Sequence, residues 1–285
     1  MIPVFMNPDS GKAAAARGAL RASGGFDIRE APPATLAEQV RAAVREGATR
    51  VLVAGGDGSI GIAASVLVGT GVELAIIPSG TLNHLARDLG LPLALGAAAR
   101  VALGAATRVI DVGAVNDRIF LNTSAVGAYV SFVRLRERIE RRLGYRTASL
   151  IAGMRLVLHM PSFLVSLQVE GASREYVTPL VFIGVGEREL KLPTLGARVP
   201  HGRTGLHVMV VRERSGGRAL AMSLAAATRG VEAVSRTPAL DSFIVDAFTV
   251  QPRVPRIALD GEIVPVTPPL RYRHIPGRLN VVVPV

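Results

Sequence analysis

The first 110 residues alternate short apolar segments with helix-compatible segments, and this alternation constrains the fold more than any other feature of the chain. The apolar segments predict strands at Ile2–Met6, Phe26–Arg29, Arg50–Ala54 and Glu73–Ile77. Helical patterns follow these strands at about 12–22, 35–46, 59–68 and 82–89. Strands that alternate with helices form parallel sheets covered on both faces. We therefore predict an α/β domain built on a parallel sheet.

The texture of the sequence changes near residue 112. A basic helical stretch at roughly 130–159 and a helix at about 217–235 accompany short β-rich segments that prolines and glycines separate. These segments are Leu164–Val169, Leu180–Val185, Leu206–Val211, Ser242–Val250, Ile257–Leu259, Ile263–Val266 and Leu279–Val283. Short strands at this spacing are typical of a sandwich or barrel-like domain. The chain thus divides into residues 1–112, which the tail 276–285 could complete, and residues 113–275.

The charge balance restricts the partners. Basic residues number 33 against 22 acidic ones, a net charge of +11, and lysine occurs only at Lys12 and Lys191, so that 31 of the 33 are arginines. This excess favours nucleic acid, an anionic lipid surface or a phosphorylated substrate. Eight Phe, four Tyr and no Trp are few for a surface that stacks single-stranded bases. The absence of cysteine excludes disulfides, thiolate metal sites and cysteine nucleophiles.

No segment has the character of a membrane span or an export signal. The opening MIPVFMNPDSGK lacks a basic region, and the charge-free stretch Gly58–Val72 holds 15 residues including four glycines. A membrane-spanning helix needs about 20 apolar residues. We therefore expect a cytoplasmic protein.

Three glycine-containing loops follow predicted strands of the first domain. They are Asn7–Gly11, Gly55–Ser59 and Pro78–Asn83. The carboxyl ends of parallel strands form the edge where open α/β sheets bind ligands, near a change in strand order. Glycine lets backbone N–H groups approach an anion, and the N-terminus of the following helix favours phosphate. In these loops Ser59 and Thr81 are candidates for helix N-caps or for phosphate donors, and Asn83 can donate its amide.

An acidic side chain, Asp57, stands inside the second of these loops. A carboxylate at a place otherwise suited to anions makes sense if a magnesium–nucleotide or a proton abstraction is involved. The chain has neither a GxxxxGK[ST] loop nor a kinase-type GxGxxG motif, so the two commonest nucleotide cradles are absent.

A second acidic site, Asp260 and Glu262, lies near the end of the chain. Asp-Gly between alternating apolar residues is the usual two-residue hairpin turn. The same turn could present two carboxylates to a substrate hydroxyl, where one of them would act as the base in phosphoryl transfer.

Taken together, GGDGS at 55–59, PSGTLNHLAR at 78–87, the NPDSG opening and DGE at 260–262 resemble the diacylglycerol kinase catalytic-domain family. This family includes soluble bacterial lipid kinases and the sphingosine and ceramide kinases, and it is distantly related to NAD kinases. The resemblance extends along the whole chain through Asp111, the segment 120–122 and the closing stretch 276–284. It implies an α/β domain, a β-sandwich, and ATP in the cleft between them.

The resemblance also implies roles for individual residues. The nucleotide-binding positions are Asn7, Gly55, Gly56, Asp57, Gly58, Ser59, Gly80, Thr81 and Asn83. Asp260 and Glu262 match the region proposed to supply the general base. In relatives that role has been given to the residue that matches Asp57, and the sequence does not decide which of these carboxylates is the base. Asp111 is a candidate ligand of the ATP-bound magnesium.

Several positions depart from the family pattern. Gly61, Ile62 and His84 replace the family's usual polar or acidic residues, which are a small polar–Glu pair and an aspartate. A segment at 202–208 lacks the acidic residues thought to hold a structural metal, and 186–193 replaces the glycine-rich substrate segment, so the acceptor can differ from diacylglycerol.

The motifs and the family resemblance together predict a lipid kinase that uses ATP and Mg²⁺ to phosphorylate a diacylglycerol-like lipid alcohol. The basic segment 132–146 is either a surface helix docked on the core or an amphipathic element that meets anionic headgroups. We expect peripheral membrane contact and no binding of nucleic acid. The sequence does not decide whether the protein forms a homodimer. Alternatives are an NAD-kinase-like enzyme and a catalytically impaired relative that binds nucleotide or lipid.

Overall fold

The computed structural model of the 285-residue chain divides into two compact units. It describes residues 1–127, 162–169, 171–189, 197–199, 201–212, 240–252 and 256–285, together with the single residues 130, 135, 138, 139, 144, 147 and 151. Unit 1 comprises Met1–Val112 and Ile275–Val285, and unit 2 comprises Gly113–His274. Within the described parts of the chain, no helix is both long and apolar enough to cross a membrane.

Unit 1 is built on a parallel sheet with the order β2-β1-β3-β4-β18. Its strands are β1 (Ile2–Met6), β2 (Phe26–Glu30), β3 (Arg50–Gly55), β4 (Glu73–Pro78) and the end of β18 (Leu270–Val282). Between them run the helices α1 (Ala13–Ser23), α2 (Pro33–Arg45), α3 (Asp57–Leu67), α4 (His84–Asp88) and α5 (Leu95–Leu103). Since β1 has β2 on one side and β3 on the other, the strand order reverses between β1 and β3.

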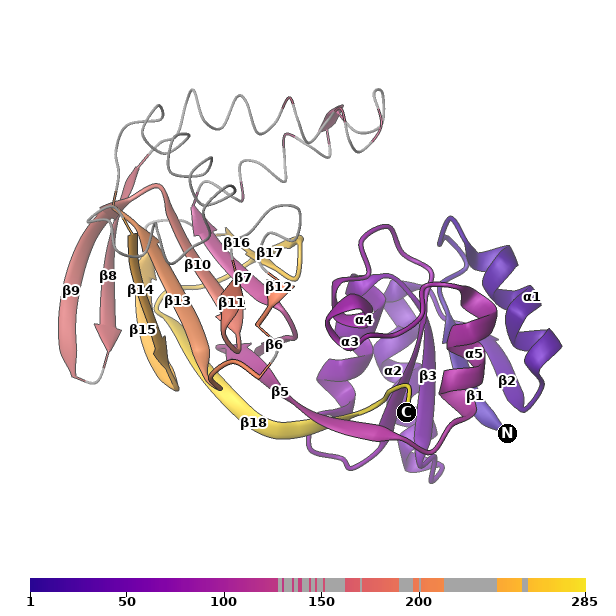
Figure 1. Cartoon of the computed structure of the whole chain (residues 1–285). Coiled ribbons are helices and arrows are strands. Elements are labelled where there is room, and N and C mark those ends of the chain that lie inside the picture. Colours follow the sequence, from indigo (N-terminus) through magenta and orange to yellow (C-terminus); the bar gives the residue numbers. More distant parts are fainter. Residues whose placement is uncertain are drawn as a thin grey trace. The chain divides into compact units, whose positions relative to one another are not determined.

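Helices cover both faces of this sheet (Figure 1). Val4, Met6, Leu52 and Ala54 point to one face, where they pack with Ala and Leu side chains of α1 and α5. The intervening residues of the same strands are also buried, and α2 and α3 pack on their side. Strands that are apolar on both faces are expected for a parallel sheet. The predicted α/β domain is confirmed.

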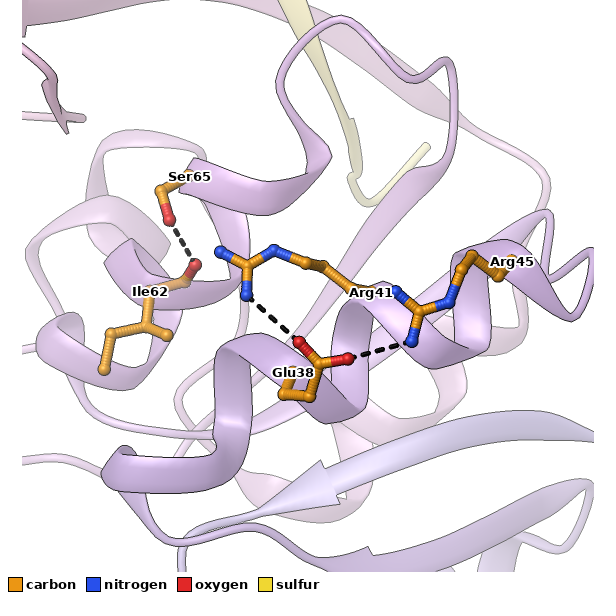
Figure 2. Close-up of polar contacts among 5 residues, drawn as sticks. All are labelled: Glu38, Arg41, Arg45, Ile62 and Ser65. Carbon is orange, nitrogen blue, oxygen red and sulfur yellow. Dashed lines mark hydrogen bonds and ion pairs between the residues drawn. The ribbon is translucent and has the colours of Figure 1, made fainter.

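Polar contacts lie near the surface of α2 and α3, within each helix (Figure 2). On α2, Glu38 accepts hydrogen bonds from Arg45 at 2.8 Å and Arg41 at 3.4 Å. These arginines, Arg45 first, hold the pKa of the Glu38 carboxyl below its usual value. On α3, the Ser65 hydroxyl donates to the carbonyl oxygen of Ile62 at 2.7 Å. Ile62, one of the departures from the family pattern, thus lies within a regular helix.

Unit 2 is a sandwich of two antiparallel sheets. One sheet has the order β14-β13-β10-β7-β16-β17, and in the other β18, β15, β8 and β9 are neighbours. The strands are β5 (Thr107–Val115), which begins in unit 1, β6 (Arg118–Phe120), β7 (Thr123–Gly127), β8 (Phe163–Val169), β9 (Ala172–Thr178), β10 (Leu180–Val185), β13 (Leu206–Val211), β14 (Leu240–Val245), β15 (Ala247–Pro252), β16 (Arg256–Leu259) and β17 (Glu262–Pro265). The strands β11 (Arg188–Glu189) and β12 (Ala197–Arg198) pair antiparallel in a separate two-stranded sheet.

An apolar core fills the space between the two sheets of unit 2. At its centre the ring of Tyr272 stacks on Phe248 at 4.8 Å and meets Phe120 edge-on at 6.1 Å. The Tyr272 hydroxyl lies 2.8 Å from the Ser124 hydroxyl, and burial raises the pKa of this tyrosine. The predicted β-sandwich is confirmed.

The sequence-based element assignment is wrong at several places. The strand predicted at Ser242–Val250 is two strands, because the chain bends at Asp246 and passes from one sheet (β14) to the other (β15). The prediction missed α5, β5, β6, β7, β9 and the two-residue strands β11 and β12, and it identified only the end of β18. In β9 only Tyr176 and Thr178 are buried, and most of the other residues are polar and exposed. The helices predicted at 130–159 and 217–235 lie outside the described residues, except for single positions of the first.

Candidate active site

The three glycine-containing loops come together at the carboxyl edge of the unit 1 sheet. They follow β1, β3 and β4, and β1 and β3 flank the point where the strand order reverses. Hydrogen bonds join the loops: the Asn7 N–H donates to the Ala54 carbonyl at 3.2 Å, and the Ser79 N–H donates to the Gly55 carbonyl at 3.1 Å. The sheet places this loop cluster where open α/β folds bind ligands.

The loop after β3 leads directly into α3. Gly56 is the N-cap residue, and the helix begins at Asp57 without a side-chain cap. Its first backbone bond runs from the Ile60 N–H to the Gly56 carbonyl at 3.0 Å. The N–H groups of residues 57–59 belong to the first turn and have no partner within the helix. With the helix dipole they form a site suited to a phosphate group.

Two glycines let the loops after β3 and β4 approach each other closely. A Cβ atom on Gly80 would lie 2.4 Å from the Cα atom of Gly56, and a Cβ atom on Gly56 would lie 3.2 Å from the Cα atom of Gly80. Gly55 has a separate restriction, because its Cβ would lie 2.6 Å from the Cβ of Ser59. Between Gly56 and Gly80 the added Cβ atom would contact backbone, so no side-chain rotation could relieve the contact.

The loop after β4 is held by Asn83, which adopts the left-handed conformation with a φ of 52°. Its side-chain oxygen accepts the Gly80 N–H at 3.0 Å, and its side-chain nitrogen donates to the Gly80 carbonyl at 2.8 Å. Asn83 is buried, and both ends of its amide therefore shape the loop. Thr81 and His84 are exposed. The caps of α3 and α4 are Gly56 and Asn83, so the prediction that Ser59 or Thr81 caps a helix is wrong.

Serine side chains join the loops after β1 and β4. The hydroxyl of Ser10 lies 2.9 Å from the Ser79 carbonyl oxygen and 3.0 Å from the Ser79 hydroxyl. On the same β1 loop, the side-chain oxygen of Asn7 accepts the Asp9 N–H at 3.0 Å. Sequence reasoning did not select Ser10 or Ser79, because only the sheet shows that residues 69 positions apart meet.

The carboxylate of Asp57 lies in the same cluster. One of its oxygens accepts the N–H of Leu85 at 3.4 Å, which links the start of α3 to α4. The side chain is half-buried. Within the residues that the structure describes, no three His, Cys, Asp or Glu side chains form a metal-binding group. Mg²⁺ on a nucleotide commonly uses one or two carboxylates together with phosphate oxygens, and Asp57 fits that pattern.

Asp111 lies at the other edge of the sheet. It accepts the Gly277 N–H at 2.9 Å. Asn280 pairs with Glu73, the first residue of the parallel neighbour β4, so Gly277 lies beyond the amino end of that strand. The glycine loops follow the carboxyl ends. The structure therefore does not bring Asp111 to the loop cluster.

Asp260 and Glu262 belong to unit 2. Asp260 opens the turn between β16 and β17, and Glu262 is the exposed first residue of β17. The Asp260 carboxylate accepts the N–H groups of Leu121, Asn122 and Thr123 at 2.7–2.9 Å.

Hydrogen bonds connect the segment at 202–208 to Glu187, Arg188 and Ser242. Glu187 accepts the Arg203 N–H at 2.9 Å, and this bond is the main cause that lowers the pKa of Glu187. The buried His207 ring accepts the Arg188 N–H at 2.9 Å and lies 2.7 Å from the Ser242 hydroxyl. Burial lowers the pKa of His207, against the opposing effect of Glu187. Hydrogen bonds and an ion pair hold this segment.

Comparison with known proteins finds a family similarity in the N-terminal part of the chain. The diacylglycerol kinase catalytic domain matches residues 1–115. The resemblance inferred from the glycine loops is confirmed, and those loops lie inside the matched region.

Curated relatives point the same way. A diacylglycerol kinase of Mycobacterium tuberculosis is 46% identical over 77 residues, which are 27% of this chain and 25% of that protein. A Pseudomonas putida protein named "Probable lipid kinase YegS-like" is 31% identical over 175 residues, 59% of this chain and 58% of its own length. An uncharacterized Synechocystis protein is 26% identical over 84% of this chain and 56% of its own length. The chain thus spans between a quarter and three fifths of these relatives.

Solved structures extend the likeness to the fold of both units. The crystal structure of a diacylglycerol kinase from Bacillus anthracis has a TM-score of 0.71 at 17% identity and covers 99% of this chain and 96% of its own. Another Bacillus anthracis chain reaches a TM-score of 0.77 at 20% identity with the same coverage. At such identities the comparison establishes the fold alone.

Proposed function

We propose that the protein is an ATP-dependent lipid kinase that transfers the γ-phosphoryl group to the hydroxyl of a diacylglycerol-like lipid alcohol. The observation that carries the proposal is the loop cluster at the strand-order reversal, where the start of α3 offers backbone N–H groups and the contact between Gly56 and Gly80 keeps side chains out. The match of residues 1–115 to the diacylglycerol kinase catalytic domain supports phosphoryl transfer as the reaction at this loop cluster.

The chain's own residues divide the work in the proposed reaction. The N–H groups of residues 57–59 hold phosphate oxygens, and the helix dipole of α3 stabilises the negative charge on them. Asn83 and the serine contact between Ser10 and Ser79 keep the neighbouring loops in place. Mg²⁺, held by Asp57 and phosphate oxygens, would neutralise charge on the transferred group. The proton of the lipid hydroxyl goes to a carboxylate, for which Asp57, Asp260 and Glu262 are the candidates.

Peripheral contact with an anionic membrane is part of the proposal. A lipid substrate resides in a bilayer. The chain has a net charge of +11, and 31 of its 33 basic residues are arginines. Anionic lipid attracts basic segments by about 1 kcal/mol for each residue near the surface. The segment 132–146 is the first candidate for this contact, and nearly all of it lies outside the described residues.

The decisive experiment is a transfer assay with γ-labelled ATP and Mg²⁺. The purified chain is offered diacylglycerol and other lipid alcohols in mixed micelles, with and without an anionic lipid, and Asp57→Asn serves as the impaired control. We expect label in a lipid product, more of it with anionic lipid, and a loss of about 10²-fold or more in the variant, because charge stabilisation and proton transfer each contribute on this scale. Nucleotide binding without transfer to any lipid would contradict the proposal, and labelling of NAD would favour the NAD-kinase-like alternative.

A further inference from the structure

The turn between β16 and β17 has a geometry that fixes where Asp260 points. Leu259 pairs with Glu262, so the turn consists of Asp260 and Gly261 alone. Both residues have positive φ, 47° and 91°. Positive φ at both central residues is the mark of a type I′ hairpin turn, and aspartate tolerates this conformation better than most residues do. Aspartate, asparagine and glycine all suit the first position of this turn, so the turn alone does not account for the choice of a carboxylate over an amide there.

The carboxylate of Asp260 explains that choice, because it binds the backbone of another segment. Its oxygens accept the N–H groups of Leu121 at 2.7 Å, Asn122 at 2.8 Å and Thr123 at 2.9 Å. The Asp260 N–H in turn donates to the Thr123 carbonyl at 2.8 Å. Distances of this size are typical of charge-assisted hydrogen bonds. An ionised carboxylate offers about four acceptor positions, and three of them are occupied by these N–H groups.

The segment that Asp260 binds is the connection between β6 and β7. From the other side, the Asn122 carbonyl accepts the Val185 N–H of β10 at 2.9 Å. The strand that follows, β7, lies between β10 and β16 in the six-stranded sheet. Residues 121–123 are thus held between two strands, and the turn that carries Glu262 is tied to the same segment.

We propose that Asp260 is a positioning residue: its carboxylate fixes residues 121–123 and the turn that presents Glu262, and it does not take the substrate's proton. Three short backbone hydrogen bonds occupy three of the about four acceptor positions of the Asp260 carboxylate, which leaves little room for a substrate hydroxyl. The catalytic consequence rests on the proposed kinase function, whereas the structural claim does not.

Amide hydrogen exchange tests the structural claim without any substrate. In the full chain we compare Asp260→Asn and Asp260→Gly with Asp117→Asn, the same change in the two-residue turn between β5 and β6. Asparagine and glycine both accept the left-handed conformation, and neither can accept all three N–H groups. We expect exchange at residues 121–123 to rise about tenfold or more in both Asp260 variants, the factor that corresponds to losing one charge-assisted hydrogen bond, and to stay unchanged in Asp117→Asn. Unchanged exchange in both Asp260 variants would overturn the proposal.

The pH dependence of transfer separates positioning from proton abstraction. A positioning role predicts that Asp260→Asn lowers kcat but keeps the acidic limb of the wild-type pH profile, since the proton acceptor is still present. Loss of that limb with normal amide exchange at 121–123 would identify Asp260 as the base and overturn the proposal. If no lipid is phosphorylated, the kinase function fails while the exchange experiment still decides the role of Asp260.

Discussion

At the scale of single residues, the contact between Gly56 and Gly80 gives the loop cluster its tightest requirement. A methyl group on Gly80 would lie 2.4 Å from the Gly56 Cα atom, and only backbone movement could relieve this. We predict that Gly80→Ala costs about 1–3 kcal/mol of unfolding free energy, as overpacking usually does, and weakens ATP binding. Denaturant unfolding and nucleotide titration measure both effects.

The matched control for this substitution is Gly61→Ala in α3. A Cβ atom there has nothing within 4 Å. Alanine should therefore leave nucleotide binding intact and stabilise the helix by about 0.5–1 kcal/mol. Equal stability and equal affinity in the two variants would contradict the steric account of the loop cluster.

Residue types indicated the loop cluster, but they could not assign the contacts within it. The pattern of glycines after apolar segments placed the loops correctly, because that pattern reports strand ends. The role of Asn83 was not predictable, since its amide can face either a ligand or the backbone, and only its left-handed φ turns it back onto Gly80. The charge on Asp260 is likewise explained only by a partner segment some 140 positions earlier in the chain.

At the scale of elements, the sequence indicated strands that are continuous apolar runs and missed β9, whose sequence is mostly polar. The parallel strands β1, β3 and β4 are continuous apolar runs, which are easy to recognise. β9 has buried side chains only at Tyr176 and Thr178, so its polar sequence gives little signal. The bend at Asp246 divides one apolar run between two sheets, and no local pattern marks that change of partner.

The hydrogen bonds of His207 between β13 and β14 predict how unit 2 responds to acid. Its ring accepts the Arg188 N–H and must stay neutral to do so. Burial, with Arg203 and Arg188 nearby, lowers its pKa, and Glu187 opposes them. An unfolded histidine titrates near about 6.5 and then takes up a proton that the folded one refuses, so stability should be full above that pH and fall as the pH drops below it.

Thermal unfolding between pH 7.5 and 5 measures this effect. We expect His207→Asn to remove part of the pH dependence, up to about 1.4 kcal/mol per pH unit over the affected range. His201→Asn, at an exposed position with a φ of 57° that asparagine tolerates, should keep the wild-type slope. The same slope in all three proteins would show that His207 is not the group responsible.

At the scale of the whole molecule, the chain returns at its end to the unit in which it began. Residues 275–285 belong to unit 1, where β18 pairs in parallel with β4. Unit 1 therefore lacks one strand of its sheet until the last residues of the chain are in place. Local patterns predicted a strand near the C-terminus but not its neighbour, because strand pairing depends on topology rather than on the residues of one segment.

This arrangement predicts that a substitution near the C-terminus weakens a sheet whose other strands lie in the first 80 residues. Leu279 is fully buried, so Leu279→Ala should cost about 2–5 kcal/mol through lost apolar contact and the cavity left behind. Val285→Ala, at a fully exposed position, should cost almost nothing. Hydrogen exchange locates the effect: protection should fall in β3 and β4 and remain in β10 and β13, because separate cores stabilise the two units. An equal loss of protection in both units would instead show that the two cores unfold as one.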